Sequence, residues 1–206
     1  MTANDRLIIF VRKAEKGQLK KRLVDDIGSE QALVVHHKLQ LYTKEITRSL
    51  NCEKAVYYAD QIDHNDLWDN MIYDKGLQQG DDRGMRMNDA FSRAFADGKQ
   101  RVIIIGTDCI DLESYMIKEA FAVLESNDVV IGPAKDGGYY LLGMKKFLPT
   151  LLTDKDWNSD NLLMDTLLDL KKLKSKYYLL KTLNDINSAE DLDQMAKFQE
   201  KPEDWF

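Results

Sequence analysis

Cysteine, histidine and long apolar runs are scarce in this sequence. Its 206 residues include two cysteines and three histidines, too few for a disulfide scaffold and without the spacing of a structural zinc site. The longest apolar runs, residues 7–11 and 102–105, are far shorter than the roughly 20 residues of a membrane-spanning helix. The first residues do not resemble a signal peptide, so we expect no transmembrane segment and a cytoplasmic location.

An excess of positive charge is also absent. The chain has 29 Lys and Arg residues against 35 Asp and Glu residues, a formal net charge of −6. A general nucleic-acid binder needs a broad basic surface, so we expect no nucleic-acid partner. The low proline and glycine content, 3 and 11 residues, is typical of an ordinary globular protein. The length predicts a single domain, residues 1–206.

Two common phosphate-binding motifs are missing. No Gly-x-Gly-x-x-Gly follows the first apolar run, and Gly137 is not followed by the Lys and Ser or Thr of a P-loop, which argues against dehydrogenases and P-loop NTPases. Instead, the run from Arg12 to Arg22 holds six basic residues and one acid around Gly17. A loop of this kind after a strand is suited to bind a diphosphate, and a solvated basic loop is the alternative interpretation.

Apolar runs alternate with segments of helical periodicity along the chain. Strands are expected at residues 7–11, 55–59, 101–106, 128–132, 139–143 and 177–182, with a possible short strand near 71–73. Helices are expected from Ser29 through Ile46 and around residues 87–95, 117–124, 160–174 and 189–198. This alternation predicts an α/β fold with a mainly parallel sheet flanked by helices, which binds ligands at the carboxyl ends of its strands.

Asp108 directly follows the most apolar run, in the segment Gly106-Thr107-Asp108-Cys109-Ile110-Asp111. A carboxylate fixed there could hold Mg²⁺ or Mn²⁺, which would stabilise a departing diphosphate. Asp111 could instead cap the following helix. Cys109 is interpreted as a small buried residue, because no histidine spacing marks a partner for a catalytic thiol.

A glycine-rich bend, residues 132–140, separates two apolar runs. In it, Asp136 could act as a base, an acceptor contact or a further metal ligand, and an ordinary Asp-Gly turn is the alternative. Gly84-Met85-Arg86 at the start of a helix could bind phosphate or ribose, or only position the helix. The polar turn that contains Asp185 is interpreted first as a helix cap.

Several of these segments together resemble a known family. They are FVRKAEKGQLKKRL, GMRM, IIIGTDC, VVIGPAKDGGYYLLG and NDINSAEDL. In this order, and over nearly the whole chain, they are similar to the radical-SAM/selenodomain-associated glycosyltransferases of the nucleotide-diphospho-sugar transferase superfamily, which has the GT-A fold. The resemblance implies a nucleotide-binding half at about residues 1–112 and an acceptor-side half at about 113–206.

The resemblance also implies roles for individual residues. Asp108 corresponds to the metal-binding aspartate, and Asp185 lies in a late acidic motif near the metal. Nucleotide binding is expected from Arg12, Gly17, Lys20, Arg22, Arg86 and Thr107, and acceptor binding from Gly137, Gly138 and Tyr139. The chain departs from the family pattern at Lys21, Arg83 and Asn187, among others, where Thr, an apolar residue and Asp are usual; Asn187 puts a late metal ligand in doubt.

These observations lead to one principal expectation and two alternatives. The principal one is a transferase, dependent on Mg²⁺ or Mn²⁺, that moves the glycosyl group of a nucleotide sugar to an unknown small-molecule acceptor, with Asp136 as the catalytic base. The first alternative is a nucleotidyltransferase, similar to guanylyltransferases, that releases pyrophosphate from a nucleoside triphosphate. The second is a nucleotide-binding module without turnover. Fold and superfamily do not decide among them.

Overall fold

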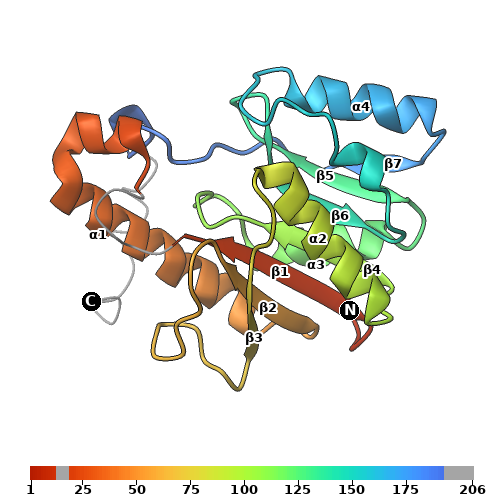
Figure 1. Cartoon of the computed structure of the whole chain (residues 1–206), viewed down its shortest axis with the longest axis horizontal. Helices are drawn as coiled ribbons and strands as arrows, with labels where there is room; N and C mark the ends of the chain where they lie inside the picture. Colours follow the sequence, from red (N-terminus) through yellow and green to blue (C-terminus); the bar gives the residue numbers. More distant parts are fainter. Residues whose placement is uncertain (13–18, 193–206) are drawn as a thin grey trace.

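A computed structural model describes residues 1–12 and 19–192, and its centre is a sheet of seven strands (Figure 1). The strand order is β3-β2-β1-β4-β6-β5-β7. The strands are β1 (Asp5–Val11), β2 (Glu53–Tyr58), β3 (Tyr73–Leu77), β4 (Arg101–Ile105), β5 (Val129–Pro133), β6 (Tyr139–Met144) and β7 (Tyr177–Leu179). Continuous apolar runs form β1 and β4 because these central strands are covered on both faces.

The sheet is mainly parallel, as the sequence predicts. Only β6 is antiparallel to its neighbours, β4 and β5. In the parallel pair of β1 and β4, Ile9 lies opposite Ile105. Three residues beyond this pair, Arg12 and Asp108 therefore leave the sheet at the same edge. This edge is where the α/β pattern predicts ligand binding.

Helices cover both faces of the sheet. They are α1 (Lys21–Arg48), α2 (Arg83–Ala96), α3 (Ser114–Val123) and α4 (Leu162–Lys172), with a short 3₁₀ helix, η1 (Pro149–Leu151). Apolar residues of α3 pack with Ile9, Ile103 and Ile105 on one face, and α2 and α4 pack with Ile8 and Ile104 on the other. None of the described helices is long and apolar enough to span a membrane.

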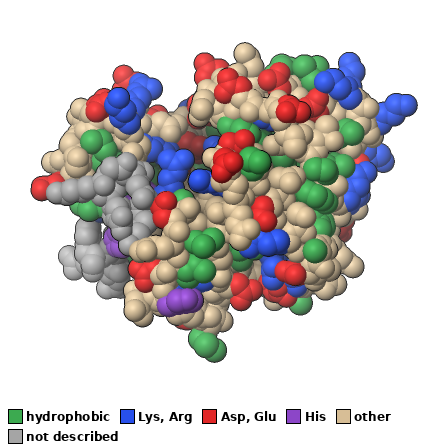
Figure 2. Space-filling model, in the orientation of Figure 1, with side chains coloured by type: hydrophobic (Ala, Val, Ile, Leu, Met, Phe, Trp, Pro, Cys, Tyr) green, Lys and Arg blue, Asp and Glu red, His purple; other side chains and the backbone are tan. Residues whose placement is uncertain are grey.

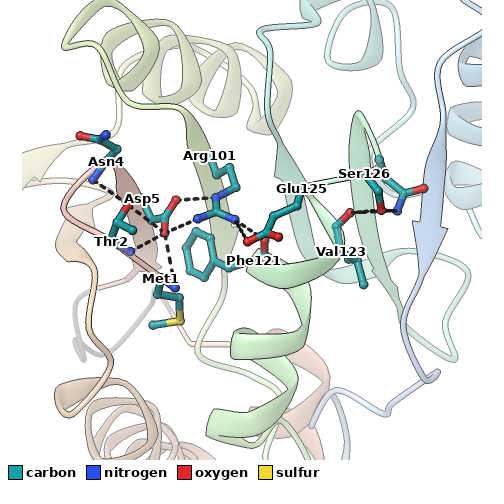
Figure 3. Close-up of polar contacts among 10 residues, drawn as sticks. Met1, Thr2, Asn4, Asp5, Arg101, Phe121, Val123, Glu125 and Ser126 are labelled. Atoms are coloured by element: carbon teal, nitrogen blue, oxygen red, sulfur yellow. Dashed lines mark hydrogen bonds and ion pairs between the residues drawn. The ribbon is translucent and has the colours of Figure 1, made fainter.

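The amino ends of β1 and β4 are joined by a buried ion pair (Figure 3). Asp5 is fully buried and accepts hydrogen bonds from Arg101 Nε and Nη2 at 2.6 and 2.9 Å. Arg101 also donates to the Phe121 carbonyl and to Glu125 of the α3 region, at 3.0 Å each. These bonds fix the register of β1 and β4 at their amino ends, at the edge of the sheet opposite the carboxyl edge.

Some element boundaries differ from the sequence prediction. The first helix begins at Lys21 rather than at Ser29, because two helical segments join across Gly28, whose φ of 81° is outside the helical region. The strand expected near residues 71–73 lies at 73–77. The expected helix at 189–198 extends beyond the described residues, and its first four residues form a 3₁₀ turn. The boundary between two halves near residue 112 stays a prediction.

Candidate functional site at the carboxyl edge of the sheet

A pocket of about 240 Å³ lies at the carboxyl edge of the sheet. It is lined by the ends of β1 and β4, the beginning of β6, and the segments that precede α1 and α2. Its charged lining residues are Arg12, Lys20, Asp81, Asp82, Arg83, Arg86 and Asp108. Figure 2 shows basic and acidic side chains gathered around a hollow in the upper part of the molecule. Four cations against three carboxylates give the pocket lining a small excess of positive charge in a protein of net charge −6.

Lys20 and Asp108 meet in this pocket. Lys20 Nζ lies 3.0 Å from Asp108 Oδ2 and donates hydrogen bonds to the Ile186 carbonyl at 2.8 Å and to Asn187 Oδ1 at 2.7 Å. The Lys20 ammonium thus links three segments that are far apart in the sequence. Lys20 was predicted to bind the nucleotide and Asp108 to bind its metal. The structure brings these two side chains into direct contact.

Asp185 lies beside Lys20 and Asp108 because residues 183–186 form backbone hydrogen bonds and a β-bridge with neighbouring segments. Leu183 forms a parallel bridge with Ala134, so Asp185 and Asp136, two residues further along each segment, lie near each other. The Ile186 N–H donates to the Asp108 carbonyl at 2.9 Å, which holds Asp185 beside Asp108. The sequence prediction left the role of Asp185 open, and the structure brings it to Asp108.

The carboxyls of Asp108 and Asp185 have opposite pKa shifts. Burial raises the pKa of Asp185 to about 6, with the negative charge of Asp108 as the next contribution. Burial also acts to raise the pKa of Asp108, but the charge and hydrogen bond of Lys20 outweigh it and lower that pKa. Lys20 therefore stabilises the ionised form of Asp108, whereas burial and the charge of Asp108 destabilise the ionised form of Asp185.

The two carboxylates fit a divalent cation. Asp185 Oδ1 is buried and has no hydrogen-bond partner among the described residues, so a cation would satisfy an oxygen that otherwise lacks one. Carboxylate oxygens are the ligands that Mg²⁺ and Mn²⁺ prefer. Residues 1–12 and 19–192 contain no cluster of three or more His, Cys, Asp or Glu side chains suited to a metal. A cation held by Asp108 and Asp185 would thus take its other ligands from water and from phosphate oxygens.

The other predicted nucleotide-binding residues differ in position. Arg12, Arg86 and Thr107 line the pocket with Lys20. Arg22 does not line it; its exposed side chain lies 3.9 Å from Glu190. The prediction for Gly17 falls outside the described residues. The structure therefore brings together most of the predicted set but places Arg22 on the surface beside the late segment.

The predicted acceptor-side residues form a turn next to the pocket. Tyr139 lines the pocket, and its ring packs edge-on against Trp157, with the ring centroids 6.1 Å apart. Asp136 is exposed, and its Oδ1 accepts a hydrogen bond from the Gly138 N–H at 3.0 Å. Gly137 has a φ of 87°, and a Cβ there would lie 1.9 Å from the Asp160 carbonyl oxygen. Gly137 thus permits close packing of the 154–161 loop against this turn.

Sequence reasoning missed His36 and Gln78 as pocket residues. Gln40 Nε2 and His36 Nε2 lie 2.9 and 3.1 Å from the Arg12 carbonyl oxygen, so α1 holds the end of β1. Gln78 donates to the carbonyls of Val11 and Tyr57 at 3.1 and 2.8 Å. A correct boundary for β3 would have placed Gln78 at the carboxyl edge, whereas no sequence signal separates His36 from a surface residue.

Cys109 and Asp111 lie beside the site. Burial raises the pKa of the Cys109 thiol, which keeps it protonated at neutral pH, in agreement with the predicted role as a small buried residue. The N-cap position of α3 is occupied by Glu113 rather than by Asp111.

Solved structures with this architecture come from several transferase types. A crystal structure of a "putative nucleotide-diphospho-sugar transferase" from Desulfovibrio desulfuricans G20 is 26% identical, with a TM-score of 0.87 over 98% of this chain and 90% of that chain. The 4-diphosphocytidyl-2C-methyl-D-erythritol synthase of Anaerococcus prevotii DSM 20548 is 12% identical, with a TM-score of 0.55 over 96% of each chain. CMP:2-keto-3-deoxy-manno-octonic acid synthetase in complex with CTP is 9% identical, with a TM-score of 0.59 over 95% of this chain and 98% of that chain.

The last two similarities, at this low identity, concern the fold alone. No curated protein matches the sequence. A family model does match, over residues 42–159, which is more than half of the chain. The chain belongs to the family DUF2064, uncharacterized proteins conserved in bacteria.

Proposed function

We propose that this protein is a transferase that binds a nucleoside-diphosphate sugar and moves its glycosyl group to a small-molecule acceptor. The observation that carries the proposal is the contact of Lys20 with Asp108 beside Asp185, at the carboxyl edge of β1 and β4. The similarity to the Desulfovibrio protein supports the donor class. The motif resemblance supports placement with the selenodomain-associated glycosyltransferases.

The charges of the cluster suit a nucleotide diphosphate. Asp108 and Asp185 would hold Mg²⁺ or Mn²⁺, which neutralises phosphate charge and stabilises the departing diphosphate. Lys20 would then exchange its contact with Asp108 for a phosphate oxygen, while the Ile186 carbonyl and Asn187 keep its Nζ in place. Arg12 and Arg86 line the same pocket and supply further positive charge for the phosphates. Catalysis would rest mainly on positioning and charge stabilisation.

Asp136 is the proposed base that accepts a proton from the acceptor hydroxyl. It is exposed and so accessible to an acceptor, and it is close enough to Asp185 to raise the pKa of that carboxyl. Its Oδ1 is oriented by the Gly138 N–H, which leaves Oδ2 for the acceptor. Tyr139 and Trp157 would form the adjoining wall of the acceptor site.

Nucleotidyl transfer from a nucleoside triphosphate is the second candidate function. It is favoured by the shared fold with a 4-diphosphocytidyl-2C-methyl-D-erythritol synthase and with a synthetase crystallised with CTP. The same cations and carboxylates would serve it, because both reactions release a phosphorylated leaving group. The two functions differ in product, since one releases a nucleoside diphosphate and the other pyrophosphate.

A ligand screen followed by a product assay tests the proposal. Nucleotides and sugar nucleotides are screened by thermal shift with Mg²⁺ or with EDTA, because a ligand that binds only the folded state raises its melting temperature. The best donor is then incubated with candidate acceptors, and nucleoside diphosphate and pyrophosphate are quantified. Release of nucleoside diphosphate from a sugar nucleotide supports glycosyl transfer, and release of pyrophosphate from a triphosphate supports the second candidate.

Two variants control this experiment. Asp108→Asn should abolish turnover and the Mg²⁺-dependent part of the thermal shift. Asp165→Asn, an exposed residue of α4 outside the pocket, should behave as the unmodified protein. Binding without either product would identify a nucleotide-binding module, and the absence of any stabilising nucleotide would refute the proposal.

A further inference from the structure

Arg83 is a pocket cation that the proposed nucleotide contacts do not use. It is the first residue of α2, its side chain is exposed, and it lines the pocket. Within the described residues it forms no hydrogen bond or ion pair, in contrast to Lys20 and to Arg86, whose Nε donates to the Gly80 carbonyl. A cation that faces a pocket without an anionic partner has its donors available to a ligand.

The Arg83 guanidinium lies beside an aromatic ring, a contact that uses none of its N–H groups. The guanidinium carbon lies 6.0 Å from the centroid of the Trp157 ring, at the limit of a cation–π interaction. Gly84 permits this arrangement, because a Cβ at that position would lie 2.5 Å from Trp157 Nε1. The five N–H donors of the guanidinium remain for a carboxylate or phosphate group.

Arg83 is on the acceptor side of the pocket. Its neighbour Trp157 packs on Tyr139, the first residue after the glycine turn. Its charge acts on the carboxyl of Asp185 and on the hydroxyl of Tyr139, which places it near the carboxylate cluster. Lys20, by contrast, precedes α1, and Figure 1 shows the first turns of α1 and α2 well apart. Lys20 and Arg83 thus enter the pocket from different elements, and the charges of both act on Asp185.

We propose that Arg83 binds an anionic group of the acceptor, so that the acceptor of this transferase carries a phosphate or a carboxylate. This inference rests on the proposed function and names the substrate class of the acceptor site. The nucleotide phosphates would contact Lys20, Arg12 and Arg86, and the acceptor anion would contact Arg83. The acceptor hydroxyl would then lie next to Asp136 and the carboxylate cluster.

Trp157 provides a direct readout for this site. Glycerol 3-phosphate, lactate and glycerol are titrated as phosphate, carboxylate and uncharged probes, and the change in tryptophan fluorescence is recorded. The titrations use protein saturated with Mg²⁺ and the best nucleotide of the screen, and they are repeated without nucleotide. Trp157→Phe should remove the signal, which assigns it to this ring rather than to Trp68 or Trp205.

We expect saturable binding of one or both anionic probes and none of glycerol. Arg83→Leu should weaken anion binding about tenfold or more, as expected for the loss of a charged hydrogen bond, and should leave nucleotide affinity within about twofold. Arg83→Lys should retain part of the affinity. Arg48→Leu, which removes an exposed arginine at the end of α1, should change neither affinity.

Three results would overturn the inference. One is equal anion binding by the unmodified protein and Arg83→Leu, and another is the absence of binding by either anionic probe. The third is a parallel loss of nucleotide and anion affinity in Arg83→Leu, which would assign Arg83 to the nucleotide. Failure of the proposed function would show as the absence of nucleotide binding in every variant. The probe titrations without nucleotide would still test whether Arg83 binds the anionic probes.

Discussion

At the scale of single residues, the site depends on Asp185, a carboxyl that the folded protein keeps in an unfavourable environment. Its Oδ1 is buried without a partner among the described residues, and burial raises its pKa to about 6, well above the usual range of an aspartate. Such a group is expected at a functional site, where a ligand rather than the protein satisfies it. In a protein built for stability alone, a neutral residue at this position would be favoured.

This environment predicts a specific pH dependence of stability. Because the folded protein binds the Asp185 proton more tightly than the unfolded chain, the stabilising contribution is present below about pH 4 and is lost as pH rises through about 6. In EDTA, we expect the free energy of unfolding of Asp185→Asn, relative to that of the unmodified protein, to rise by roughly 2–3 kcal/mol as the pH is raised from 4 to 7. Urea unfolding at several pH values measures this gain. Parallel stability curves for the two proteins would show that Asp185 is not perturbed.

Lys20 has the opposite role, because it compensates Asp108 in the absence of ligand. Lys20→Ala removes the contacts to Asp108, Ile186 and Asn187, so we expect nucleotide affinity to fall about tenfold or more. Lys20→Arg keeps the charge and should recover part of this affinity. The matched variant Lys21→Ala changes the exposed neighbour and should bind normally. Direct binding measurements decide, and a normal affinity in Lys20→Ala would exclude the phosphate role.

Sequence and structure agree on some residues and differ on others for physical reasons. Thr107 and Asp108 could be placed because they directly follow a strongly apolar strand, whose position is clear from the sequence, and Lys20 because it belongs to the basic segment that follows another such strand. For Asp185 only the family resemblance indicated a place near the metal, because its position depends on the pairing of Leu183 with Ala134, which is a long-range contact. Arg22, two residues beyond Lys20, differs in position because its exposed side chain lies near Glu190 rather than in the pocket.

At the scale of elements, the glycine turn at Gly137 brings the 154–161 loop against the segment next to the pocket. Of the two glycines Gly137 and Gly98, which both have positive φ (87° and 80°), only Gly137 has another segment against it.

The central strands were predicted well because burial on both faces gives a continuous apolar run. The beginning of α1 and the position of β3 were predicted less well, because a kink at Gly28 and a short, partly exposed strand leave a weak pattern.

The two glycines form a matched pair of substitutions. Gly98→Ala adds only backbone strain, so it should destabilise the fold by about 1–2 kcal/mol. Gly137→Ala adds the same strain and a Cβ 1.9 Å from the Asp160 carbonyl oxygen, so we expect a loss about 1–3 kcal/mol larger. Denaturant midpoints of both variants measure the difference. Equal losses would mean that the 154–161 loop does not pack on this turn.

At the scale of the whole molecule, the fold separates stability from function at opposite edges of one sheet. The amino edge is fixed by the satisfied ion pair of Asp5 and Arg101, whereas the carboxyl edge holds charges that are only partly compensated. The net charge of −6 is unfavourable for an anionic ligand at long range, so binding depends on the local cations of the pocket. Membership of a family and a fold does not choose the reaction, which depends on the residues at this edge.

Isothermal titration calorimetry of the best nucleotide from the screen tests the central claim most directly. It is carried out on the unmodified protein and on Asp108→Asn, each in Mg²⁺ and in EDTA. We predict that the unmodified protein binds about tenfold or more tightly in Mg²⁺ than in EDTA, and that Asp108→Asn loses this difference. Equal affinity in Mg²⁺ and EDTA for the unmodified protein, with no change in Asp108→Asn, would contradict the account.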